Sequence, residues 1–154
     1  MIRLNKACLF FLLLILMDGA CLYALPDSKD PRAWYERSAE DFEAAGFLHR
    51  EGKFEGSVCF HAHQAIEKSL KGTLIAEGIS PERNHDTENF ARQLSKFYPG
   101  IKSFERDLSW IDGLYIPSRY PKVGVSAIRG EEAGRCLELA RSILEWTQTK
   151  AVRS

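Results

Sequence analysis

Four polar side chains recur along one predicted helix at a spacing that could hold an anion. They share one face, opposite much of the apolar stripe, because steps of three, four and three residues separate them: His61, Gln64, Lys68 and Lys71. The two ammonium groups could meet an anionic ligand, while the amide and the imidazole add hydrogen bonds. A solvated helix face explains the same spacing, since charged residues must lie somewhere on the surface.

A second candidate is the segment 115–121, which reads Tyr-Ile-Pro-Ser-Arg-Tyr-Pro. Its two prolines stiffen the chain. Arg119 offers a planar fork suited to phosphate or carboxylate, and Tyr120 offers a stacking face. In the alternative interpretation the segment is a structural plug, whose tyrosines pack on the rest of the fold while Arg119 satisfies loop carbonyls. The sequence favours neither interpretation over the other.

The common catalytic and ligand-binding motifs are missing from the sequence. It has no glycine-rich phosphate loop, no HExxH and no paired CxxC. Cys59 and His63 share a helix face, but zinc takes three or four protein ligands, and a cysteine on a packed helix face is usually inert. With the N-terminal residues 1–24 set aside, which contain Cys8 and Cys21, two cysteines remain, and two do not make a disulfide framework. Cys59 and Cys136 fall on apolar stripes, which is typical of buried thiols. We therefore predict no catalytic residue, no metal site and no cofactor.

The elements that must position these residues are amphipathic helices. Apolar residues recur at steps of three and four, and no run alternates as a strand would. Asp30 is the expected cap of the first helix, because Pro31 suits the first helical turn. The predicted helices cover about 31–50, 54–76, 86–97, 101–115 and 129–147, with a long loop over 116–127. Successive amphipathic helices with short connections pack antiparallel. The predicted fold class is all-α, an up-and-down bundle of four to five helices.

Charge and composition exclude two classes of protein. Lys plus Arg and Asp plus Glu both number 21, so the formal net charge is zero. A protein that coats nucleic acid by charge alone needs a pronounced excess of basic residues. The apolar content of 45% with 27% charged residues is ordinary for a globular domain and wrong for a disordered chain.

The N-terminal segment differs from the rest of the chain. Arg3 and Lys6 precede eleven apolar, uncharged residues at 7–17, fewer than the ~20 that a membrane-spanning helix needs. A basic start followed by a short apolar stretch matches a secretory signal peptide. A misassigned start ahead of a cytosolic domain explains the segment equally well. We divide the chain into this apolar segment, 1–24, and a helical domain, 25–154.

A family resemblance becomes visible in the second predicted helix. Residues 59–71 read Cys-Phe-x-Ala-x-Gln-Ala-x-Glu-Lys-x-Leu-Lys. With the segment 115–121 and, more weakly, the last helix, this pattern resembles the HEPN domain family over about residues 30–147. The resemblance implies a prokaryotic helical bundle that commonly forms a homodimer. It favours a cytoplasmic protein, with export the alternative if residues 1–24 are a genuine signal peptide. Many such proteins are encoded beside a minimal nucleotidyltransferase and bind it, as a toxin–antitoxin pair or as a substrate-binding subunit.

Some members of the family are metal-independent ribonucleases, and this sequence departs from their pattern. Those members have an Arg followed by a His four to six residues later. None of the four histidines here lies at that distance after any arginine, and positions 123–125, after Arg119, are Val-Gly-Val. The resemblance therefore leans away from an enzyme.

The expected function is that of a non-catalytic HEPN protein that binds a nucleotide, a small nucleotidyltransferase partner, or both. The residues expected at that surface are His61, Gln64, Lys68, Lys71, Arg119 and Tyr120. We also expect a homodimer, for which the aromatic first helix and the regular stripe at 101–115 leave apolar surface. Two alternatives remain. One is a ribonuclease with a rearranged site, in which His61 or His85 is brought near Arg119, although RNA is the less favoured ligand. The other is an exported helical interaction protein.

Overall fold

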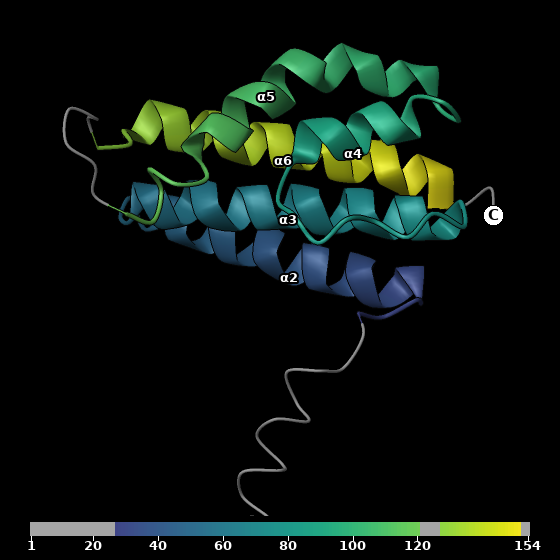
Figure 1. Ribbon diagram of the computed structural model, residues 1–154. Coiled ribbons are helices and arrows are strands. Elements are labelled where there is room, and N and C mark those ends of the chain that lie inside the picture. The colour runs from purple at the N-terminus through teal and green to yellow at the C-terminus, as the bar shows by residue number, and fades with distance from the viewer. Residues whose placement is uncertain (1–26, 121–126, 152–154) are drawn as a thin grey trace, which may run out of the picture.

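The computed structural model describes residues 27–120 and 127–151, which form a bundle of α-helices with one 3-10 helix and no strand. The expected N-terminal segment, 1–24, and the Val-Gly-Val at 123–125 lie outside the described residues. The helices keep the labels of Figure 1. They are α2 (Pro31–Arg50), α3 (Glu55–Ala76), α4 (Thr87–Leu94), the 3-10 helix η1 (Pro99–Phe104), α5 (Glu105–Leu114) and α6 (Gly130–Ala151). The all-α bundle expected from the sequence is confirmed.

The starts of α2 and α4 follow the local sequence closely. The Asp30 side chain accepts a hydrogen bond from the backbone N–H of Arg32 at 3.0 Å, and Pro31 occupies the first helical position. Asp86 likewise accepts from the N–H of Asn89 at 2.7 Å. These side chains satisfy amides that have no partner within the helix. The cap predicted at Asp30 is confirmed, and Asp86 caps α4 in the same way.

Helix α3 is the centre of the bundle. It runs through the middle of Figure 1, with α2 on one side and α6, α4 and α5 on the other. The largest buried side chains of the core include Ile66, Leu70, Leu74, Phe90, Leu108 and Ile143. Gly72 lets α2 approach closely, because a Cβ there would lie 2.9 Å from the Tyr35 ring and 3.2 Å from the carbonyl oxygen of Pro31. Helix α3 is therefore fixed in place by the helices packed around it, and its side chains are held with it.

The bounds predicted for the third and fourth helices are wrong. The α-helix expected to run to Phe97 ends at Leu94, and the one expected from Ile101 starts only at Glu105. Between them η1 has 3-10 geometry, in which the Ile101 N–H donates to the carbonyl oxygen of Tyr98 at 3.1 Å. Pro99 has no N–H to continue the preceding helix. Its fixed φ instead suits the first position of the short helix that follows.

The expectation of two buried thiols is wrong, because Cys59 and Cys136 form a disulfide. The bond joins α3 to α6 with a Cα–Cα distance of 5.3 Å, across 77 residues of sequence. Both residues are buried, as expected from their apolar stripes. Those two stripes face each other in the bundle, so the same pattern that buries the sulfurs also brings them together.

None of the helices in the described part of the chain is long and apolar enough to cross a membrane.

Candidate functional site

Glu67 is the hub of a buried ionic network on α3. Its carboxylate lies 2.8 Å from Lys71 Nζ, 2.8 Å from His85 Nδ1 and 3.1 Å from Gln64 Nε2. Lys71 also donates to the carbonyl oxygen of Asn84 at 3.0 Å, and only 7% of it is exposed. The segment between α3 and α4 runs back along α3 in Figure 1 and covers this part of the helix. Lys71 is thus neutralised and enclosed.

Two more of the candidates on α3, His61 and Lys68, meet a carboxylate from α2. Asp41 lies 2.9 Å from His61 Nδ1 and also pairs with Lys68 Nζ. Lys68 and His61 remain partly exposed. The four predicted residues of α3 thus pair with two carboxylates. Asp41 binds His61 and Lys68, and Glu67 binds Gln64 and Lys71.

A third carboxylate, Asp112 of α5, holds the buried His63. Asp112 Oδ1 lies 2.8 Å from His63 Nε2 and accepts from the Thr87 hydroxyl at 2.8 Å, while Oδ2 accepts from the Glu88 N–H at 3.1 Å. Burial raises the pKa of Asp112, but these hydrogen bonds together outweigh burial, so the pKa lies below its ordinary value. His63 Nδ1 has no hydrogen-bond partner among the described residues and lies 4.0 Å from Glu67 Oε2.

Tyr115 connects these networks to the loop after α5. Its ring stacks on His85 with centroids 4.6 Å apart and contacts His63 at 4.8 Å. The guanidinium carbon of Arg119 lies 3.8 Å from the centroid of the same ring. A Cβ on Gly56 of α3 would lie only 2.8 Å from the carbonyl oxygen of Ser118, so glycine permits this close approach of the loop.

Arg119 lies among aromatic rings. Its Nε donates to the carbonyl oxygen of Tyr115 at 3.2 Å, and its guanidinium carbon lies 5.2 Å from the Phe60 ring and 5.5 Å from the Tyr120 ring. Within residues 27–120 and 127–151 no carboxylate pairs with Arg119, and Tyr120 is 57% exposed. The loop combines both interpretations: Tyr115 packs on the bundle, while Arg119 and Tyr120 face solvent.

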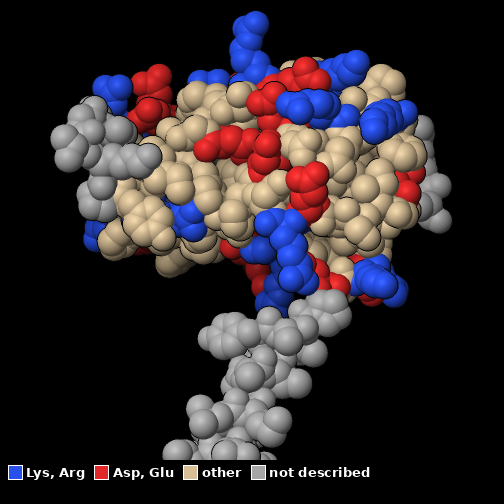
Figure 2. All heavy atoms as spheres, viewed as in Figure 1, with Lys and Arg blue, Asp and Glu red and all other residues tan. Residues whose placement is uncertain are grey.

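The charge on the face that Figure 2 shows is mixed. Acidic residues gather over its middle and basic residues lie beside them, without a continuous basic surface on that face. The net charge of the whole chain is zero, which does not fit a protein that coats nucleic acid by charge alone.

Sequence reasoning missed the three carboxylates of this region, Asp41, Glu67 and Asp112. One signal was available for Glu67, because His63, Glu67 and Lys71 follow one another at steps of four residues. Opposite charges four residues apart on a helix are neighbours and commonly pair. Asp41 and Asp112 come from other helices, and no local spacing indicates them.

Comparison with known proteins defines the family. The family model described as the HEPN domain matches residues 31–150, which cover every helix described above except the last residue of α6. The chain therefore belongs to the HEPN domain family.

Two solved structures have the same fold. The chain is similar to TT1696 from Thermus thermophilus, with 26% identity, a TM-score of 0.72, and coverage of 80% of this chain and 99% of that one. It is also similar to ST0689, an archaeal HEPN homologue, with 26% identity, a TM-score of 0.64, and coverage of 80% and 98%. None of the curated proteins compared with the chain matches it.

Proposed function

We propose that this HEPN protein is a non-catalytic binding module and that its ligand is a nucleotide, held at the loop that contains Arg119 and Tyr120. One observation supports the proposal most directly. Arg119 lacks a carboxylate partner among the described residues, whereas Lys68 and Lys71 are both paired. An exposed cation beside an exposed aromatic ring matches the two parts of a nucleotide.

The chemistry of the loop fits this ligand. A guanidinium presents a planar fork to phosphate oxygens, and an exposed tyrosine ring provides a stacking face for a base. The rings of Tyr115 and Phe60 lie within 3.8 and 5.2 Å of the guanidinium carbon, so packing restrains the side chain before a ligand arrives. Restraint of this kind lowers the entropy lost on binding. Of the candidates on α3, Gln64 and Lys71 pair with Glu67, which also holds His85 against the Tyr115 ring. His61 and Lys68 pair with Asp41 of α2.

Thermal unfolding of the chain against a panel of nucleotides tests the proposal. A ligand at a hundred times its dissociation constant stabilises the fold by about 2.7 kcal/mol, which is a shift of roughly 2–8 °C. Arg119→Ala abolishes the shift. Arg106→Ala is the matched control, because Arg106 is an exposed arginine of α5 outside the loop, and it leaves the shift unchanged. Absence of a shift with every nucleotide rejects nucleotide binding.

A protein ligand of the same loop is the second form of this binding role. Family membership suggests a minimal nucleotidyltransferase, as in a toxin–antitoxin pair. Co-expression with such an enzyme tests it: the pair co-purifies, and Arg119→Ala or Tyr120→Ala releases it while Arg106→Ala does not. If neither nucleotide nor nucleotidyltransferase binds, the loop has no binding role.

One observation favours a metal-independent ribonuclease as a second candidate. His85 and Arg119 contact the same Tyr115 ring, and Glu67 holds His85 Nδ1 at 2.8 Å while half of the imidazole remains exposed. A positioned imidazole could transfer protons while a guanidinium stabilises phosphate charge. Cleavage of RNA in the presence of EDTA, lost in His85→Ala, supports this candidate. Intact RNA under those conditions rejects it.

A further inference from the structure

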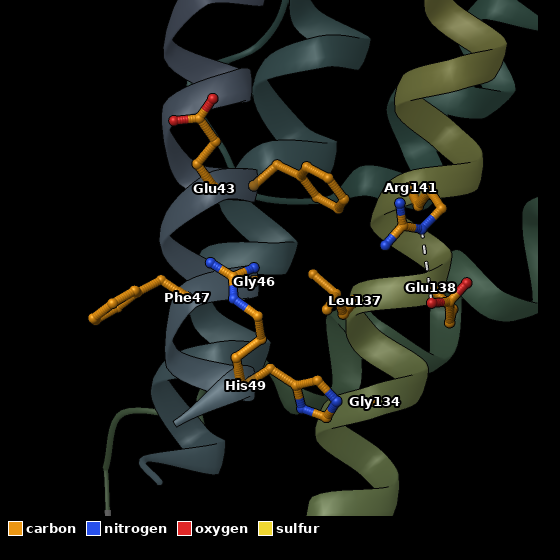
Figure 3. A pocket seen from close by; sticks show the side chains of 10 residues that line it. Glu43, Gly46, Phe47, His49, Gly134, Leu137, Glu138 and Arg141 are labelled. Atoms are coloured by element: carbon orange, nitrogen blue, oxygen red, sulfur yellow. Dashed lines mark ion pairs between the residues drawn. The ribbon is translucent and has the colours of Figure 1, made fainter. Parts of the chain in front are cut away.

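A groove separates α2 from α6 on the side of the bundle shown in Figure 3. Both helices pack mainly on α3 and only lightly on each other. The groove has a volume of about 940 Å³, within the range typical of small-molecule sites. Phe42 and Leu137 line it and also pack against the core, so its floor is apolar. The fold therefore leaves a space beside the core that its own side chains do not fill.

Contacts between α2 and α6 mark the two ends of this groove. At one end the His49 imidazole reaches across to α6, because a Cβ on Gly134 would lie 3.6 Å from His49 Cε1 (Figure 3). At the other end the guanidinium carbon of Arg141 lies 5.4 Å from the centre of the Phe42 ring. On each helix seven positions separate the two contacts, which is about 10 Å at the rise of an α-helix. The groove is thus long enough for a medium-length hydrocarbon chain.

Two basic side chains of the groove have no acidic partner in the part of the chain that the structure describes. Neither His49 nor Arg50 forms an ion pair within residues 27–120 and 127–151. Arg50 folds back along α2, since a Cβ on Gly46 would lie 3.4 Å from its Nη1. Its guanidinium therefore lies beside the middle of the groove. Both basic side chains are exposed, so a ligand can reach them from solvent.

The acidic residues of the lining restrict the charge of a ligand. Glu138 Oε1 lies 3.7 Å from Arg141 Nε and offsets that cation. Glu43 also lines the groove, but in Figure 3 its carboxylate does not point toward α6. Two glutamates repel an anion with several charges more strongly than one with a single charge, because the Coulomb energy scales with charge. The lining therefore favours a ligand with one negative charge.

We propose that this groove binds an organic carboxylate whose body is a hydrocarbon. The Arg50 guanidinium binds the carboxylate, because its planar fork matches the two oxygens, and His49 adds a hydrogen bond. The hydrocarbon body lies over Phe42 and Leu137, where it is removed from water. The proposal is independent of nucleotide binding, because none of the residues proposed for the nucleotide lines this groove.

Titration calorimetry of the full chain with three probes tests the chemical class of the ligand. Decanoate, which has both the carboxylate and the chain, binds to one site. Acetate has only the carboxylate and decan-1-ol only the chain, so each binds at least about tenfold more weakly. Absence of decanoate binding up to about 1 mM overturns the proposal. Decan-1-ol that binds as tightly as decanoate also overturns it, because the groove is then only an apolar surface.

Loss of the unpaired guanidinium tests where the carboxylate lies. Arg50→Gln removes the charge and the fork, and it weakens decanoate binding about tenfold or more. Arg106→Gln is the matched control, because Arg106 is an exposed arginine of α5 outside the groove, and it leaves the affinity unchanged. Arg119→Ala also leaves the affinity unchanged, so failure of nucleotide binding and failure of this proposal are separate results.

A larger side chain in the middle of the groove gives an independent readout. Within the described part of the chain a Cβ on Gly46 would meet only the flexible end of Arg50, so the fold itself tolerates a larger residue. Gly46→Leu fills the groove and abolishes decanoate binding. The free energy of unfolding stays the same or rises, because leucine favours a helix more than glycine does. If both Arg50→Gln and Gly46→Leu retain the original affinity, decanoate binds elsewhere and the proposal is overturned.

Discussion

The polar face of α3 and the loop after α5 both present cationic side chains, but they accommodate the charges differently. On α3, Lys71 meets Glu67 at 2.8 Å and is almost fully buried, and Lys68 meets Asp41. On the loop, Arg119 lies over the Tyr115 ring at 3.8 Å without a carboxylate partner among the described residues. The first arrangement holds helices together. The second leaves a charge exposed.

The difference follows from the two kinds of side chain and from burial. An ammonium group removed from water needs a carboxylate or several oxygen acceptors, because an unpaired buried charge is costly. A guanidinium is more weakly hydrated and stacks on aromatic rings, so it remains stable at the surface without a counter-charge. Mutations of the paired charges on α3 should therefore lower stability, whereas mutations of Arg119 should mainly affect ligand binding.

The largest loss of stability is expected from removing Glu67, the carboxylate at the centre of the ionic network on α3. Among the described residues, Glu67→Ala leaves the buried Lys71 with the carbonyl oxygen of Asn84 as its one acceptor. Removing one partner of a buried pair costs about 3–5 kcal/mol, a large part of the roughly 5–15 kcal/mol typical of a whole domain. Urea unfolding followed by circular dichroism measures this loss. Glu145→Ala, at an exposed position of α6, is the control and changes stability by less than about 0.5 kcal/mol.

The second largest loss of stability is expected from removing the disulfide that joins α3 to α6. The Cys59–Cys136 disulfide closes a loop across 77 residues of sequence, and removing such a bond costs about 2–4 kcal/mol. The double variant Cys59→Ala/Cys136→Ala should lower the urea midpoint, and reductant should lower it only in the parent chain. A peptide map without reductant should contain the linked pair. Free thiols at both positions would contradict the bond.

The third effect is a pH dependence that arises from Asp112. Burial raises its pKa, but hydrogen bonds from His63, the Glu88 N–H and Thr87 bring it below the ordinary value. The stabilisation is thus present above the unfolded pKa of about 3.9 and is lost as pH falls through the lower folded value. Asp112→Asn lowers the melting temperature at pH 7, and its difference from the parent narrows below about pH 4. A constant difference from neutral pH down to about pH 2.5 would contradict this origin.

The fold was predictable because its signals are local. The Asp30–Pro31 start of α2 and the apolar stripe of α3 identify their helices without knowledge of the partners. The exception, η1, depends on how Pro99 interrupts the hydrogen bonds of its neighbours. A periodicity of three and four residues does not separate a 3-10 turn from the first turn of an α-helix.

The site was less predictable because its contacts are long-range. Helical spacing correctly placed Lys68 and Lys71 on one face of α3. It could not show that the segment before α4 covers Lys71, or that Asp41 reaches Lys68 from α2. The disulfide could not be predicted for the same reason. Its two cysteines lie 77 residues apart, on apolar stripes that meet only in the folded bundle.

The smallest effect on stability, and the sharpest on ligand binding, is expected at Arg119. Arg119→Ala removes contacts with aromatic rings at the surface, each worth about 0.5–1 kcal/mol, and exposes no buried charge. Its free energy of unfolding should therefore fall by about 1–2 kcal/mol at an exposed site, less than for Glu67→Ala, while any nucleotide-dependent thermal shift disappears. Arg119→Lys keeps the positive charge but loses the planar fork, so it should retain stability and recover only part of the shift. A loss of stability as large as that of Glu67→Ala would show that the loop, like α3, uses its cation to hold the fold.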